Sequence, residues 1–351
     1  MTAQNTTSTD TFRKFMIALV VILFIALVGS LIFYYLRYFG PNVTSKQEYL
    51  YIRTGEGYDD VYKTIREQGI VSDTTTFNWA AHNMKYTEKV KPGRYRLKPG
   101  MSNRKLINML LAGNQDPVVL SFHNLRLKTQ FAGFVGKKLE PDSASIIRLL
   151  DSADFVKQYG FTTDNVYTVF MPDSYDVYWN TTPEKLFKRM YDHYEHFWTP
   201  ERKQKAAAIN LTPVQVSILA SIVDGEALHD DEMPTIAGLY LNRLKRGQKL
   251  ESDPTLIFAI GDFTIRRVLN KDKVFNSPYN TYLHTGLPPG PVMMPSVNAI
   301  NAVLDYKHSN YIYMCAKEDF SGYHNFADNL ADHMVNARKF QHALDERNIK
   351  R

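Results

Sequence analysis

The sequence of 351 residues contains a single cysteine, Cys315. One thiol cannot form an intrachain disulfide or a zinc site with several cysteine ligands, so a hydrophobic core must stabilise the fold. Several catalytic signatures are also missing: there is no G-x-S-x-G elbow, no P-loop and no HExxH motif, and Gly55-Glu56-Gly57 lacks the third glycine of a dinucleotide fingerprint. The body contains no internal repeat. We therefore expect neither a metal nor a cofactor.

Positively charged residues only slightly outnumber negatively charged ones. The formal net charge is +6, from 42 Lys and Arg against 36 Asp and Glu. The first 40 residues hold Arg13, Lys14 and Arg37 against Asp10, which is +2, so about +4 remains for the rest of the chain. This excess suits an anionic surface or polymer, but it is too small for a nucleic-acid footprint. We expect no nucleic-acid partner.

One long hydrophobic run is present. Residues 15–36 form a stretch of 22 residues without a charge, which as a helix would be about 33 Å long and could cross a bilayer core. Tyr34 and Tyr35 lie where an interfacial aromatic belt belongs. A cleaved signal peptide is the rival interpretation, but its apolar region would be only about 7–15 residues long. We predict a short tail at 1–14 and an uncleaved transmembrane helix at 15–36.

A linker with a Gly-Pro turn is expected at 37–47. From 48 to 117 the pattern predicts a strand, two helices, a second strand and a helix capped by Ser102. Such β-α-α-β units are common glycan-binding or docking modules, although an inert spacer fits the pattern equally well. The segment 118–205 is expected to contain a helix at Asp142–Tyr159, an extended stretch at 171–179 and an amphipathic helix at Pro183–Trp198.

The next helix carries the best candidate for chemistry. Thr212, a proline and Gln215 form a capping box, so a helix should begin here. Leu219, Ile222 and Glu226 continue along one side of it. A carboxyl group beside apolar side chains loses hydration, which raises its pKa and suits a general acid. The alternative is a glutamate at a helix end that turns to solvent.

The residues around this carboxyl group suggest further roles. The small Gly225 and Ala227 would leave room for a bulky ligand. The acidic run Asp230 to Glu232 should complement the dipole of a following helix, and it lacks the spacing of a metal site.

Two loops and one histidine follow. SPYNTY (277–282) and TGLPPGPVMMP (285–295) read as rigid irregular loops that could contact sugars or cover the core. His324, in GYHNF (322–326), should lie just past a strand within 311–316, where a structural histidine is the simpler interpretation. A last helix is expected at about 328–347.

Six short motifs follow one another between residues 220 and 326. They are ASIVDGEA (220–227), NRLKRG (242–247), SDPT (252–255), SPYNTY, TGLPPGP and GYHNF, and together they resemble the YceG-like, MltG-type family of endolytic murein transglycosylases. The resemblance implies an α+β fold with one transmembrane helix, a small LysM-like β-α-α-β module at 48–117 and a mixed α/β catalytic domain at 206–348. It also implies a single-pass protein of the bacterial inner membrane, with a cytoplasmic N-terminus and a periplasmic or otherwise extracytoplasmic body.

The family reaction cuts the MurNAc-GlcNAc β-1,4 bond of nascent peptidoglycan strands without water, leaves 1,6-anhydro-MurNAc ends and so terminates strand elongation. The resemblance places the catalytic acid on Glu226. Asp224 stands where relatives commonly have Glu, which leaves its supporting role open, and Ala227 replaces a frequent Thr. One carboxyl group suffices because the C6 hydroxyl of the substrate replaces the second carboxylate of ordinary glycosidases.

The resemblance also implies substrate-positioning or supporting residues and partners. The partners are peptidoglycan strands, the membrane and cell-wall synthases such as penicillin-binding proteins. Two alternatives remain open: a conventional muramidase with Asp253 as second carboxylate, and a noncatalytic wall-binding scaffold. The expected positioning or supporting residues are Asn242, Asp253, Tyr279, Asn280, Tyr282 and His324.

Overall fold

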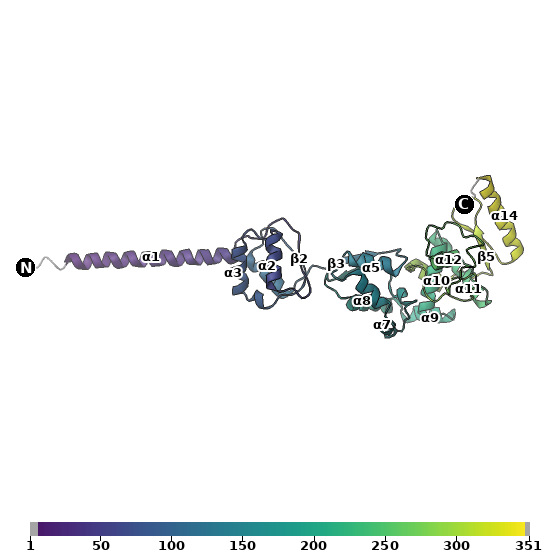
Figure 1. Ribbon diagram of the computed structural model, residues 1–351, viewed down its shortest axis with the longest axis horizontal. Coiled ribbons are helices and arrows are strands. Elements are labelled where there is room, and N and C mark those ends of the chain that lie inside the picture. Colours follow the sequence, from purple (N-terminus) through teal and green to yellow (C-terminus); the bar gives the residue numbers. More distant parts are fainter. Residues whose placement is uncertain (1–5, 348–351) are drawn as a thin grey trace, which may run out of the picture. The chain divides into compact units, whose positions relative to one another are not determined.

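The computed structural model describes residues 6–347 of a mixed α+β protein (Figure 1). The chain divides into two compact units, one formed by the residues up to Val118 together with Tyr178–Asn180, the other by Val119–Val177 and the chain from Thr181 onward. Among the described residues, the strands form three separate two-stranded sheets, β1-β2, β3-β4 and β5-β6. Helices therefore supply most of the framework that positions functional side chains.

The N-terminal helix α1 spans Thr6–Phe39. Its segment Asp10–Phe39 is apolar and long enough to cross a membrane, a property that a signal sequence near the N-terminus shares. The helix continues beyond the predicted end at residue 36 because its last turns pack on later residues of the same unit. The rings of Tyr38 and Trp79 lie 5.0 Å apart, and Asn103 donates to the carbonyl oxygen of Arg37 at 2.9 Å.

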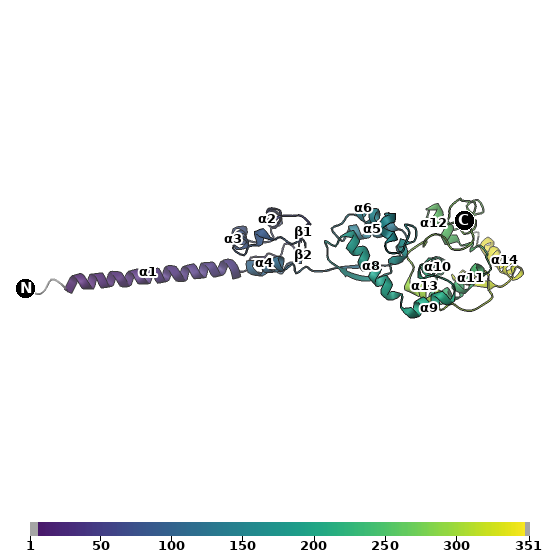
Figure 2. The ribbon, with the colours of Figure 1, turned by 90° about the horizontal axis from the view of Figure 1, so that it is seen from below.

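The first unit has the predicted β-α-α-β order, followed by a helix (Figure 2). Its strands are antiparallel, with Tyr49 opposite Arg96 and Ile52 opposite Gly93. Its elements are β1 (Tyr49–Ile52), α2 (Tyr58–Glu67), α3 (Thr74–Asn83), the short helix η1 (Tyr86–Glu88), β2 (Gly93–Arg96) and α4 (Asn103–Ala112).

The segment 37–47, expected to be a linker, is in large part built into this unit. Val43 is buried in its hydrophobic core, and the buried Asn42 donates to Asn103 at 2.7 Å and accepts from the backbone N–H of Asp73 at 2.7 Å. A buried amide must find partners, and these tie the chain after α1 to α3 and α4.

The second unit begins with a helical layer beside the pair β3-β4. The single helix expected at 142–159 is two helices, because Ser152 interrupts it and its Oγ accepts from the N–H of Phe155 to start the second. The elements are β3 (Val118–Phe122), α5 (Lys128–Gly136), α6 (Ser143–Leu150), α7 (Ala153–Lys157), η2 (Val166–Val169), β4 (Asp173–Val177), α8 (Pro183–Phe197) and α9 (Pro200–Ala208).

The rest of this unit is organised around the buried helix α10 (Pro213–Glu226), which begins at the predicted capping box. The segment 285–295 has no helix or strand, as expected, whereas α12 was not predicted. The remaining elements are η3 (Asp230–Glu232), α11 (Met233–Lys245), α12 (Asp253–Ile260), α13 (Val297–Leu304), β5 (Tyr313–Ala316), β6 (His324–Ala327) and α14 (Leu330–Glu346).

Candidate active site

Glu226 is the last residue of α10, and its carboxyl group is held by two hydroxyl groups rather than turned to solvent. Tyr240 Oη donates to Glu226 Oε1 at 2.8 Å, and Ser252 Oγ donates to the same oxygen at 2.7 Å. Within residues 6–347 no hydrogen bond is made to Oε2. Burial raises the pKa of Glu226, against the two hydrogen bonds, which lower it. The raised pKa and the unpartnered Oε2 suit a group that donates a proton.

The two hydroxyl groups come from different helices and are themselves fixed. Tyr240 is buried on α11, and burial beside the carboxyl group raises its pKa well above the ordinary value, so it remains a hydrogen-bond donor. Ser252 is buried at the start of α12, and its backbone N–H donates to Thr281 Oγ1 at 3.0 Å. Thr255 Oγ1 lies 2.7 Å from the same oxygen. This hydroxyl network sets the position of Ser252.

Two titratable side chains influence the pKa of this carboxyl group from nearby. The negative charge of Asp253 raises the pKa of Glu226, and His324 lowers it. Asp253 Oδ1 accepts a hydrogen bond from Tyr282 Oη. His324 is the first residue of β6, and Glu232 holds it with both oxygens: Oε1 accepts from the backbone N–H at 2.8 Å, and Oε2 lies 2.7 Å from Nδ1.

The acidic run lies directly before α11, but Glu232 at the N-cap position makes no side-chain cap bond to that helix. Asp230 accepts from Asn298 at 2.7 Å, and Asp231 accepts from Tyr323 Oη at 3.2 Å. Together with the Glu232 contacts to His324, these bonds join the start of α11 to chain segments about 70 and 92 residues later. These carboxylates therefore lie at the start of the helix, as expected, and also bind residues far along the chain.

Gly225 is itself exposed, but a side chain at this position would meet Pro254. A Cβ on Gly225 would lie 2.9 Å from Pro254 Cβ, so the missing side chain lets the start of α12 approach α10 closely. Asp224 binds Ser296, the N-cap of α13: Oδ2 accepts from its backbone N–H at 2.7 Å and Oδ1 from its hydroxyl at 3.1 Å. Burial raises the pKa of Asp224.

The remaining predicted residues support the loops. Asn242 donates to the carbonyl oxygens of Ser309 and Tyr311 at 2.7 and 2.9 Å, before β5. Asn280 is buried and donates to the carbonyl oxygens of residues 273 and 275. The Tyr279 ring packs 4.8 Å from that of Phe258. Of the predicted residues, Asp253 and His324 therefore act electrostatically on Glu226. Asn242, Tyr279 and Asn280 instead hold the surrounding chain segments in place.

Sequence reasoning missed Tyr240 and Ser252 as partners of Glu226. A signal for Tyr240 was available, because it lies four residues after the apolar Ile236 in a buried helix, and a buried tyrosine hydroxyl needs a partner. Ser252 opens the SDPT motif, but the partner of its hydroxyl lies 26 residues earlier and follows only from the fold.

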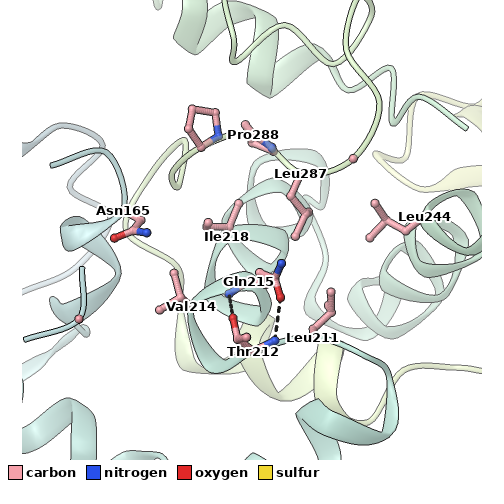
Figure 3. Close-up of a pocket in the computed structure, with 12 residues that line it drawn as sticks. Asn165, Leu211, Thr212, Val214, Gln215, Ile218, Leu244, Leu287 and Pro288 are labelled. Carbon is pink, nitrogen blue, oxygen red and sulfur yellow. Dashed lines mark hydrogen bonds between the residues drawn. The ribbon is translucent and has the colours of Figure 1, made fainter. Parts of the chain in front are cut away.

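A cavity of about 670 Å³ lies at the opposite end of α10 from Glu226, around Thr212 and Gln215 (Figure 3). Its walls are uncharged. It is therefore separate from the carboxyl group described above.

The sequence and fold are similar to known proteins. The model of the YceG-like family matches residues 50–339. The endolytic murein transglycosylase of Bacillus subtilis is 24% identical over 315 residues, covering 84% of this chain and 85% of the relative. That of Streptococcus pneumoniae strain D39 is 26% identical over 312 residues, and this match covers 80% of the chain but 56% of the relative. A crystal structure of a YceG-like protein from Listeria monocytogenes aligns over 82% of this chain and 98% of its own, with a TM-score of 0.55 and 21% identity.

Proposed function

Because this chain belongs to the YceG-like family, we propose that it is an endolytic lytic transglycosylase of peptidoglycan. It cleaves the MurNAc-GlcNAc β-1,4 bond of nascent strands and leaves 1,6-anhydro-MurNAc ends. The main support for this proposal is the environment of the Glu226 carboxyl group, whose pKa is raised by burial. Tyr240 and Ser252 hold one of its oxygens, and the other has no hydrogen-bond partner among the described residues. The curated relatives from Bacillus and Streptococcus carry this activity in their names.

The chemistry follows from this arrangement. Protonated Glu226 donates from Oε2 to the bridging oxygen, which leaves as the C4 hydroxyl of GlcNAc when its bond to C1 of MurNAc breaks. The C6 hydroxyl of the same MurNAc then bonds to C1 and returns its proton to Glu226, so no water is consumed. Tyr240 and Ser252 stabilise the carboxylate present between these two transfers through bonds to Oε1.

The replacement Glu226→Gln tests the proposal. Glutamine keeps an oxygen to accept from Tyr240 and Ser252 but has no titratable proton. We expect the rate of anhydro-end formation to fall by about 100-fold or more. Glu201→Gln is the matched control, since this glutamate is exposed on α9, where it pairs with Lys205 and makes no contact with Glu226. Unchanged cleavage by Glu226→Gln would remove this residue from the mechanism.

A conventional muramidase is the second candidate, and the proximity of Asp253 to Glu226 favours it. A hydrolase needs a second carboxylate to activate water or to attack C1. Asp253 accepts a hydrogen bond from Tyr282 and lies in the first turn of α12. In the lytic mechanism its role is to raise the pKa of Glu226. Products that carry an added water, and that disappear in Asp253→Asn, would favour the hydrolase.

The first unit is proposed to be a LysM-like wall-binding module. Its β-α-α-β order and antiparallel strands support this assignment. If the protein were instead a noncatalytic scaffold, the purified full chain would bind wall glycan without cutting it. Sedimentation with insoluble peptidoglycan, followed by analysis of released fragments, separates the two functions.

We propose that α1 is an uncleaved single-pass anchor of the bacterial inner membrane, with the body on the extracytoplasmic side and wall synthases such as penicillin-binding proteins as partners. Its last turns support this placement: Arg37 lies over the ring of Phe33 at 4.1 Å and near Trp79 at 5.1 Å, a cation and aromatic belt suited to a membrane interface. Reporter fusions before residue 10 and after residue 347 test the topology, and an intact N-terminus on the mature protein excludes a cleaved signal.

A further inference from the structure

The proposed chemistry makes no use of a cavity at the N-terminal end of α10. It has a volume of about 670 Å³ and lies within the second unit (Figure 3). One wall is α10 itself, and the opposite wall is the Gly286–Pro289 part of the TGLPPGP motif. Asn165, Val214, Gln215, Ile218 and Leu287 are the lining residues on which the following argument rests.

The chemistry of this lining is neutral and amphipathic. No charged side chain is among the residues that line it. Val214, Ile218 and Leu287 supply apolar walls, which can pack on the nonpolar face of a sugar ring. An anion or a cation would find no partner of opposite charge there. The cavity therefore suits an uncharged ligand that has both apolar and hydrogen-bonding surface.

Two amide groups face the cavity with unused donors. The oxygen of Asn165 accepts from the N–H of Thr162 at 2.8 Å, and the oxygen of Gln215 accepts from the N–H of Thr212 at 2.9 Å. These bonds fix the orientation of both amides, and neither NH₂ group has a hydrogen-bond partner in the part of the chain that the structure describes. Figure 3 shows both residues at the edge of the cavity, with the nitrogen of Gln215 directed away from Thr212. Such donors recognise carbonyl and hydroxyl oxygens.

The cavity is connected to the catalytic carboxyl group by rigid structure. Gln215 and Glu226 lie on the same helix, 11 residues and hence about 16 Å apart along its axis. The loop that forms the opposite wall continues along α10: the N–H of Val292 donates to Ser221 Oγ at 3.0 Å, and Met293 reaches the neighbourhood of Gly225. A few linked sugar units would span the distance between the cavity and the carboxyl group of Glu226.

We propose that this cavity is a second saccharide site, which binds an N-acetylated sugar of the same glycan strand a few units from the bond that Glu226 cuts. The inference rests on the proposed function. The amide donors of Asn165 and Gln215 bind the acetamido carbonyl or ring hydroxyl oxygens, and the apolar walls pack on the sugar face. Long strands gain this contact, whereas strands too short to span both places do not.

The test measures binding rather than cleavage. Isothermal titration uses the full-length Glu226→Gln protein in detergent, with uncrosslinked glycan fractionated by length, in one series peptide-free and in a second series still carrying stem peptides. Asn165→Asp and Gln215→Glu keep the oxygen that each residue needs for its local hydrogen bond and remove the NH₂ donor. Gln158→Glu, on an exposed residue close in sequence to Gly160, controls for the added charge. Val214→Trp narrows the cavity by a different means, and thermal unfolding checks that every variant folds.

We expect each donor variant and Val214→Trp to weaken the binding of long strands by roughly tenfold, with the affinity for tetrasaccharides unchanged. Equal weakening for long and short strands, or no weakening by the cavity variants, would overturn the proposal. Loss confined to strands that still carry stem peptides would assign the cavity to peptide instead and overturn it as well. The proposed reaction fails separately, if the wild-type protein forms no anhydro ends.

Discussion

Ser252 occupies the N-cap position of α12, yet its hydroxyl donates to Glu226 Oε1 at 2.7 Å and makes no cap bond to its own helix. A serine at this position usually satisfies one of the unpaired N–H groups of the first turn. Here the hydroxyl instead holds the end of α10, 26 residues earlier, and so couples the start of one helix to the carboxyl group at the end of another.

Removing this hydroxyl should change the titration of Glu226. The bond from Ser252 lowers the pKa of the carboxyl group, so Ser252→Ala raises that pKa further and moves the alkaline limb of the pH profile to higher pH. We expect kcat/KM at the optimum to fall by about tenfold, because carboxylate stabilisation and orientation are lost. The profile of kcat/KM against pH measures both effects. Ser217→Ala, a buried serine of α10 that bonds Pro213, serves as control and should leave the profile in place.

Tyr240 and Ser252 should act as a unit, because both donate to one oxygen. Tyr240→Phe alone is expected to lower kcat/KM to a similar extent as Ser252→Ala. In the double variant the losses should not add, and a coupling of about 0.5–3 kcal/mol is expected for residues that share a partner. A double-mutant cycle on kcat/KM measures this coupling. Simple additivity would mean that the two hydroxyl groups serve separate purposes.

The raised pKa of Glu226 has a cost in stability at neutral pH. The pKa of this carboxyl group is higher in the folded state than in the unfolded state, where it is about 4.3. Below the unfolded value the group is protonated in both states and does not change the free energy of unfolding. As the pH rises through the folded value, the group lowers that free energy. Glu226→Gln removes this penalty while keeping an acceptor for both hydroxyl groups. We expect a higher Tm than wild type at pH 7, with the difference shrinking towards pH 4. A difference that grows on acidification would contradict the assigned direction of the pKa shift.

Gly225 is expected to tolerate no side chain. The Cβ of Gly225→Ala would lie 2.9 Å from Pro254 Cβ and 3.0 Å from its Cγ, so the start of α12 must move and carry Ser252 with it. We expect a loss of about 1–3 kcal/mol in the free energy of unfolding, together with lower kcat/KM. Chemical denaturation and kinetics measure the two effects.

Gly133→Ala is the matched control for this substitution. Gly133 is also helical, on α5, and nothing lies within 4 Å of its added Cβ. Alanine there should stabilise the protein by about 0.5–1 kcal/mol through its better helix propensity. If both glycine variants change the free energy of unfolding and kcat/KM in the same way, the close approach of α12 does not explain the need for glycine at position 225.

Local signals were sufficient for much of the fold. The capping box at Thr212 predicted the start of α10, because both of its hydrogen bonds lie within three residues. The β-α-α-β order of the first unit likewise followed from short alternating and periodic stretches. The helix α12 was missed, since it has only eight residues, with Pro254 in its first turn, and shows no polar face to mark its period.

Contacts between distant residues were beyond such reasoning. The acidic run before α11 has the composition of a helix cap, but Glu232 is taken by His324, 92 residues later. In the same way, the Gly-Pro turn after α1 suggested a linker, whereas Asn42 and Val43 are buried against helices further along the chain. In both places tertiary hydrogen bonds and burial decide the outcome, and a local pattern carries no information about them.

The most direct measurement of the central claim is the mass of the products formed from uncrosslinked glycan in ¹⁸O-labelled water. Wild-type protein should release fragments that end in 1,6-anhydro-MurNAc, lighter than hydrolysis products by one water and free of label, while Glu226→Gln should release almost none. Labelled reducing ends from the wild-type protein, or undiminished anhydro products from Glu226→Gln, would contradict a lytic reaction carried by Glu226.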